Sequence, residues 1–227
     1  DSNGNSLLHY AAIYERINYL NLLKKFNFDF NIKNNFDENV LNYYIKSKKK
    51  NFNIIKRIIS DVNSLDSNKS NCLINFLKNF KTIENKIFDL FLNNKINLYH
   101  SNEDEISPLV QTILNNSFKN FIYIVEKIKS INYVSNQTNP ILHIYYYLKD
   151  NLDKKYLKVL LEKGYDLNNI NINLNSGVHI ICKYQKLNTQ LIDLILKYNG
   201  NFFTKNNVKK MPYDYINDLN IVNYINK

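Results

Sequence analysis

The sequence has few of the residues that interrupt regular secondary structure, with only 4 glycines and 3 prolines in 227 residues. This scarcity excludes a collagen-like or glycine- and proline-rich chain, and it disfavours an all-β fold with many tight turns. Two cysteines are too few for a disulfide framework, and no apolar run approaches the roughly 18 residues of a membrane-spanning helix. Because 44% of the residues are hydrophobic and 22% are charged, the sequence predicts a soluble, mainly helical globular protein with a core.

Positive charge and asparagine are both in excess. Lysine and arginine number 30 against 20 aspartates and glutamates, and 43 residues are asparagine. Such a charge permits attraction to nucleic acid, to an anionic membrane surface or to an acidic protein surface. Asparagine, lysine, isoleucine, tyrosine and phenylalanine are also the residues that A/T-rich codons encode, so a biased genome accounts for much of the lysine excess without any ligand. We favour this second interpretation.

The first 33 residues combine a polar turn with two short apolar stripes at helical spacing, followed by another polar turn. The stripes comprise Leu8, Ala11 and Ala12 and then Tyr19, Leu20 and Leu23. This pattern predicts a turn followed by two short antiparallel helices. With its start DSNGNSLLHYAA and its end LLKKFNFDFN, the segment resembles an ankyrin repeat. The resemblance implies an all-α solenoid in which helix-turn-helix units stack on one another.

The same frame recurs along the chain. Counted at the position that holds histidine in the first unit, seven starts follow one another at spacings of 33, 32, 36, 33, 36 and 35 residues. We therefore expect a single array over residues 1–227, with units at about 1–33, 34–65, 66–101, 102–134, 135–170, 171–205 and 206–227. Because the chain begins with aspartate and shows no targeting segment, we also expect it to be a fragment of a longer protein.

Two departures from the family pattern concern packing and the turn tips. The small Ala-Ala pair of the first helix appears only at residues 11–12, and larger side chains occupy the equivalent positions elsewhere. The turn glycine survives only as Gly4, whereas the equivalent positions hold Asp37, Lys69, Glu105, Thr138 and Leu174. We therefore predict irregular turn tips, in a stack that is less regular than an ideal array.

Three of the four histidines, His9, His143 and His179, occupy the same position of the repeat. A histidine of this kind is a candidate catalytic base or metal ligand, but the resemblance implies a structural role in which the imidazole ties the turn to the start of the helix. Periodic recurrence favours the structural role. The sequence contains no phosphate-binding glycine loop and no nucleophile elbow, so we predict a protein that is not an enzyme and needs no cofactor or metal.

In ankyrin-like proteins the partner binds to the turn tips and to the exposed side of the first helix of each unit, which implies the same surface here. The large apolar residues at those positions are Ile13, Tyr14, Phe36, Ile106, Leu114, Tyr147, Leu148 and Tyr184. Because aromatic anchors dominate interface energetics, we predict a monomeric scaffold or adaptor for protein–protein interaction. We expect it to be intracellular and cytoplasmic, in the host cytoplasm if the source is a virus or an intracellular parasite.

The alternative function is that of a basic solenoid that binds nucleic acid or an anionic membrane surface. The densest candidate cluster comprises Lys46, Lys48, Lys49, Lys50, Lys56 and Arg57. Phosphate contacts by such residues would make binding steeply dependent on salt. A solvated loop between two helices explains the same charges without a ligand, and we favour that explanation.

Overall fold

The computed structural model describes residues 1–132 and 153–226. Three predicted positions, His143, Tyr147 and Leu148, lie outside these described residues, so their roles stay predictions. Over the described part of the chain the structure is helical, and its β-structure amounts to one isolated bridge. This confirms the prediction of an all-α fold. No helix in the described part is both long and apolar enough to cross a membrane.

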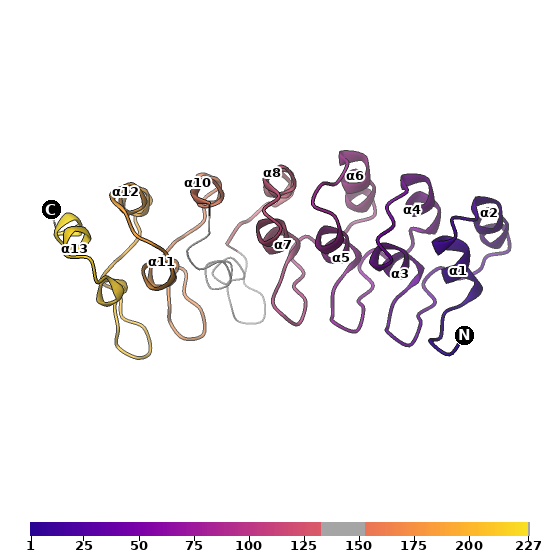
Figure 1. Cartoon of the computed structure of the whole chain (residues 1–227), viewed down its shortest axis with the longest axis horizontal. Coiled ribbons are helices and arrows are strands. Elements are labelled where there is room, and N and C mark those ends of the chain that lie inside the picture. Colours follow the sequence, from indigo (N-terminus) through magenta and orange to yellow (C-terminus); the bar gives the residue numbers. More distant parts are fainter. Residues whose placement is uncertain (133–152, 227) are drawn as a thin grey trace. The chain divides into compact units, whose positions relative to one another are not determined.

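Two compact units make up the chain, residues 1–120 and 121–227. In the first unit the helices stack in two rows, drawn in indigo to magenta in Figure 1. In one row α1 packs on α3, α3 on α5 and α5 on α7, and in the other α2 packs on α4 and α4 on α6. The bounds are α1 (Leu7–Ile13), α2 (Ile17–Lys25), α3 (Val40–Lys46), α4 (Phe52–Ile58), α5 (Cys72–Asn79), α6 (Asn85–Asn93), α7 (Pro108–Leu114) and α8 (Phe118–Lys127), which continues into the second unit.

The second unit repeats this alternation of helices. Here α11 packs against the short 3-10 helix η2, and α12 packs against α13. The bounds are α10 (Lys154–Glu162), α11 (Gly177–Tyr184), α12 (Thr189–Lys197), η2 (Pro212–Tyr215) and α13 (Leu219–Ile225). The two units therefore share one way of stacking helices, whereas a single array of seven repeats stays a prediction.

Asparagine and serine side chains begin several of these helices. Their side-chain oxygens accept a hydrogen bond from the backbone amide three residues later, as at Asn39, Asn71, Ser107, Ser176 and Asn188. Each cap satisfies a donor that the first turn of a helix leaves without an intrahelical partner. The core next to these caps accommodates large side chains. Tyr44 and Phe76 stand where the first repeat has the first alanine of its Ala-Ala pair, and both are fully buried.

Six turn tips share one geometry. In each of them an aspartate or asparagine side-chain oxygen accepts hydrogen bonds from the backbone amides two and four residues later, at Asp1, Asn34, Asp66, Asn102, Asn171 and Asn206. The residue three positions after this acceptor has a positive φ of 57–75°, at Gly4, Asp37, Lys69, Glu105, Leu174 and Lys209. The prediction of irregular tips is therefore wrong for the described tips.

The physical reason is that hydrogen bonds replace the conformational freedom of glycine. A residue with a Cβ in the left-handed region costs about 1–2 kcal/mol, but two hydrogen bonds to one side-chain oxygen contribute about 1 kcal/mol each. Successive tips also bond to each other, since the amide of Asn35 donates to the carbonyl of Asn3 at 2.9 Å and that of Ser67 donates to Phe36 at 3.1 Å. The turn is thus held without glycine.

Replacing Lys69 by glycine is expected to stabilise the protein by about 0.5–1 kcal/mol, because glycine removes the left-handed strain and adds a smaller entropy cost to folding. Denaturation in urea measures the change. The matched control is Asn68→Gly at the neighbouring tip residue, which has no positive φ and should lose stability. Equal effects of the two substitutions would show that Lys69 is not strained.

On the other side of the units, asparagine side chains link each repeat to the next. The Asn31 Oδ1 atom accepts the amide of Asp61 at 2.9 Å, and Asn63 accepts the amide of Asn97 at 2.7 Å. In the second unit the side chain of Asn168 accepts the amide of Asn201 at 2.8 Å in the same way. The abundance of asparagine therefore has a structural use in addition to any codon bias.

Candidate binding surface

His9 is fully buried in the first turn of α1 and joins two turn tips. Its Nδ1 atom accepts the backbone amide of Ser6 at 3.1 Å, and its Nε2 atom lies 3.2 Å from the carbonyl oxygen of Glu38 in the next tip. Because Nδ1 is an acceptor, the ring proton of a neutral imidazole is on Nε2 and is donated to that carbonyl. The ring thus ties its own helix to the following repeat.

His179 repeats this arrangement in the second unit. Its Nδ1 atom accepts the amide of Ser176 at 3.0 Å, and Nε2 lies 3.1 Å from the carbonyl oxygen of Lys210. Where the second repeat has Asn42 at the same position, the side-chain amide donates to the carbonyl of Ser64 at 2.9 Å. In both histidines the hydrogen bonds occupy both ring nitrogens, which is the geometry of a structural role.

A lysine and two carboxylates form a buried network under the second and third tips. The Lys46 Nζ atom lies 2.6 Å from Glu38 Oε1 and 3.3 Å from Asp66 Oδ2, and both carboxylates are almost completely buried. Asn34 donates to Glu38 at 2.9 Å, and Asn75 donates to Asp66 at 3.0 Å. Burial alone would lower the pKa of Lys46, but the hydrogen bond and charge of Glu38, together with Asp66, outweigh it and raise the pKa. Lys46 therefore belongs to the fold.

The predicted partner-binding residues differ in exposure. Tyr14 and Phe36 of the first unit are exposed, and Tyr14 stacks on Tyr10 with the ring centres 6.4 Å apart. The others in the described part of the chain are half-buried, namely Ile13, Ile106, Leu114 and Tyr184. In the second unit, Tyr184 also has the Lys183 ammonium 5.0 Å from its ring centre. The first unit thus brings two aromatic candidates to the surface, and the second unit offers a partly covered one.

The second unit exposes an apolar surface that was not selected from the sequence, and we call it the apolar tip patch. It comprises Ile170, Ile172, Leu174 and Val208, with exposed fractions of 49%, 63%, 44% and 65%. The amide of Asn207 donates to the carbonyl of Asn173 at 3.2 Å, so the two tips that carry the patch are joined. The available signal was the alternation Ile-Asn-Ile-Asn-Leu-Asn over 170–175, in which Asn171 holds the turn and the apolar side chains stay exposed.

Among the solved structures that resemble the chain, two match it over nearly its whole length. The ankyrin repeat domain of Bcl-3, a unique member of the IkappaB protein family, gives a TM-score of 0.76 at 14% sequence identity, and the match covers 99% of this chain and 100% of that one. The human ASB11 ankyrin repeat domain gives 0.69 at 16% identity, with 97% and 96% covered. The chain has the ankyrin-repeat fold. No family model and no curated protein match the sequence, so the similarity to ankyrin repeat domains rests on the fold alone.

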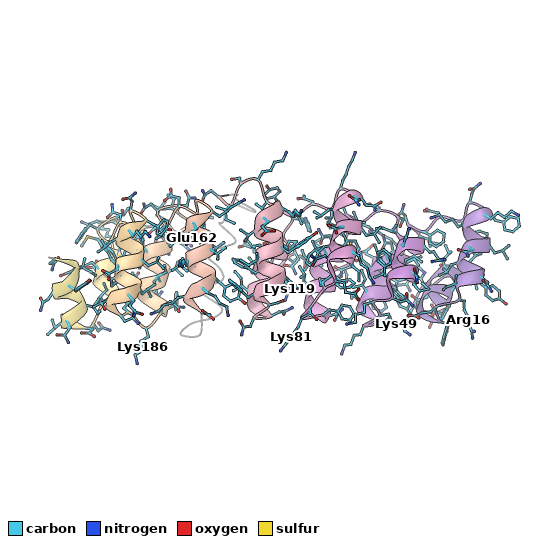
Figure 2. All side chains as sticks on the ribbon, turned by 90° about the horizontal axis from the view of Figure 1, so that it is seen from above. Arg16, Lys49, Lys81, Lys119, Glu162 and Lys186 are labelled. Atoms are coloured by element: carbon cyan, nitrogen blue, oxygen red, sulfur yellow. The ribbon has the colours of Figure 1, made fainter. Side chains whose placement is uncertain are left out.

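Several basic side chains of this chain lie in the loops between paired helices. In Figure 2 three labelled residues of the first unit, Arg16, Lys49 and Lys81, lie along one edge. Neighbouring lysines contact the fold, since Lys50 Nζ lies 5.5 Å from the centre of the Phe80 ring. The edge thus offers exposed positive charge, although the predicted cluster loses Lys46 to the buried network.

Both cysteines are buried and unpaired. Burial raises the pKa of the Cys72 thiol well above its usual value and that of Cys182 to about 12. Since the thiolate is the reactive and metal-binding form, both side chains act as small apolar residues at neutral pH. Across residues 1–132 and 153–226, no group of three or more histidine, cysteine, aspartate or glutamate side chains is placed to hold a metal ion.

The two buried histidines make stability depend on pH. Burial lowers the pKa of His9 and His179 below the ordinary 6.5, and the hydrogen bonds to backbone carbonyls oppose this effect only in part. As pH falls, these histidines therefore bind protons in the unfolded chain before they do so in the folded protein. The stability that the two neutral histidines contribute is complete above about pH 6.5 and decreases below it.

We expect the urea concentration at the midpoint of unfolding to decrease when the pH is lowered from about 7.5 to about 5.5. The control is the double variant His9→Asn, His179→Asn, which introduces the residue that Asn42 provides at this position, and it should show a smaller pH dependence. An unchanged dependence in the double variant would assign the effect to other groups.

Proposed function

We propose that this ankyrin-repeat protein is a non-catalytic scaffold that binds another protein through its turn tips and the adjoining first helices. The apolar tip patch is the observation that carries the proposal. Its four side chains are 44–65% exposed and lie on tips that hydrogen bonds hold in place. Exposed apolar groups on a rigid frame lose little entropy on binding, and several of them on two joined tips are typical of an interaction site.

The first unit supports the same proposal with two exposed residues, Tyr14 at the C-cap of α1 and Phe36 on the second tip. Tyrosine is a frequent anchor at protein interfaces because it combines apolar area with a polar end. Two buried, unpaired cysteines fit a reducing compartment. We therefore propose an intracellular protein that binds its partner as a monomer.

The alternative, binding to nucleic acid or an anionic membrane surface, rests on the exposed basic edge of the first unit. It has the support of Lys48, Lys50 and Lys81, which are all exposed. Against it, Lys46 is neutralised by two carboxylates, and Lys86 lies 2.6 Å from Glu84. We therefore rank the basic edge second.

Site-specific photocrosslinking in cells tests the proposal. A photoreactive amino acid replaces Ile172 in the apolar tip patch, or Leu196 in the control, because Leu196 is exposed on α12 and lies outside the patch. We expect discrete protein adducts at position 172 and none of the same mass at position 196. Adducts to nucleic acid or lipid at position 172, or identical adducts at both positions, would contradict the proposal.

A further inference from the structure

The first repeat has an apolar side, which we call the end face. It is formed by Leu7 and Tyr10 of α1, by Tyr14, which caps the C-terminus of α1, and by Tyr19 of α2. These side chains, with Ala11 and Arg16, line a shallow apolar hollow. Leu7 is 64% exposed and Tyr19 is 60% exposed. In Figure 1, α1 and α2 lie at one end of the first unit, with α3 and α4 as their neighbours.

The equivalent positions of the following repeats are covered. Leu7 begins α1, and the residue that begins α3, Val40, is 0% exposed in a helix that packs on both α1 and α5. Tyr19 is the third residue of α2, and the third residue of α6, Ile87, is 1% exposed where α6 packs on α4. The end face therefore continues, in position and in apolar character, the surface by which each later repeat contacts the one before it.

We propose that the end face docks a further helix pair of the same repeat type, stacked in the register in which the first repeat covers the second. Inside the first unit this register is fixed by two hydrogen bonds that backbone amides donate. The amide of Asn35 donates to the carbonyl of Asn3, and the amide of Asp61 donates to the side chain of Asn31, both at 2.9 Å. The corresponding amides of the first repeat are those of Ser2 and Asp29.

These contacts define the chemistry of the occupant. It presents an apolar side to Leu7 and Tyr19, a tip carbonyl to Ser2 and an asparagine side chain to Asp29. The last helix of the chain, α13, exposes Asn220 and Asn223 beside one apolar side chain, Leu219, which is 75% exposed, while Ile221 is buried. A second copy of this chain is therefore the occupant that the sedimentation test below addresses. The end face shares Tyr14 with the surface proposed for partner binding, but it is separate from the apolar tip patch that carries the proposed function, and the test below uses Leu7 and Tyr19 alone.

Duplicating a repeat of this chain provides a probe with the required chemistry. A second copy of residues 1–33, fused ahead of Asp1 in the full chain, supplies the needed asparagine as its own Asn31. We expect hydrogen exchange of the amides in the original α1 and α2 to slow at least tenfold, because a covered repeat opens less often. A second fusion uses a copy of residues 34–65, so that the test does not depend on one sequence.

The control carries Leu7→Lys and Tyr19→Lys in the original repeat of each fusion. Both residues are more than half exposed, so the unfused double variant should fold normally, whereas in the fusions the slowing should disappear. Unchanged exchange in both fusions would overturn the proposal. Sedimentation of the unfused chain as a dimer that the same two substitutions dissociate would also overturn it, because the end face would then bind a second copy.

Discussion

Replacing Lys46 by methionine is expected to lower the free energy of unfolding by about 3 kcal/mol, the largest effect of any surface-accessible lysine in the first unit. The substitution keeps the length of the side chain but leaves the carboxylates of Glu38 and Asp66 buried without their shared cation. Removing one member of a buried ionic group costs more than the group contributes as a whole, because the remaining charges stay desolvated. Urea denaturation at neutral pH measures the loss.

The controls separate charge from packing. Lys48 in the neighbouring loop is exposed, so Lys48→Met should change the free energy of unfolding by no more than about 0.5 kcal/mol. The triple variant Glu38→Gln, Lys46→Met, Asp66→Asn should recover at least half of the loss, since asparagine already fills the Asp66 position in four of the other described tips. A triple variant as unstable as the single one would show that the lysine contributes through packing rather than charge.

His179→Ala is expected to destabilise the protein by about 2 kcal/mol and to leave partner binding of the folded fraction unchanged. The substitution removes an acceptor from the amide of Ser176 and a donor from the carbonyl of Lys210, and the histidine site is buried. Unpaired buried groups of this kind each cost about 1–3 kcal/mol. His9→Ala should act similarly in the first unit, where the lost partners are Ser6 and Glu38.

Asparagine is the matched replacement, because Asn42 already occupies this position in the second repeat. His179→Asn should therefore lose less stability than His179→Ala. If His179→Ala had the thermal stability of the unsubstituted protein and yet abolished binding, the histidine would belong to a functional site and its structural role would be wrong.

The helical fold was predictable because its signals are local. Helix starts require an acceptor before an apolar stripe, and residues such as Asn39 and Ser176 are read directly from the sequence. The regular tips were missed for a related reason. The prediction rested on the missing glycine, but the residue that holds the turn is the aspartate or asparagine three positions earlier. Asp66 and Asn171 are examples, and this residue recurs in frame along the sequence.

The candidate surface was less predictable because exposure depends on neighbouring repeats. Ile13 and Tyr14 are adjacent in the sequence, yet one is half-buried and the other is exposed. Lys46 appears in a run of lysines, but its partner Asp66 is 20 residues away, and only the stacking of repeats brings the two together. Net charge therefore overstated the basic surface. The predicted large apolar residues did not include the four of the apolar tip patch, because their exposure is visible only in the folded tips.

The most direct test is the affinity for the protein crosslinked at position 172, measured with the full chain at about 50 mM and about 200 mM salt. Ile172→Asp should raise Kd by roughly 30-fold or more, the equivalent of a 2 kcal/mol hot spot, at both salt concentrations. Leu196→Asp should leave Kd unchanged, and reversal of Lys48, Lys49 and Lys50 to glutamate should alter mainly the association rate. Loss of binding in the lysine variant, with Ile172→Asp silent, would contradict the proposed function and favour the anionic ligand.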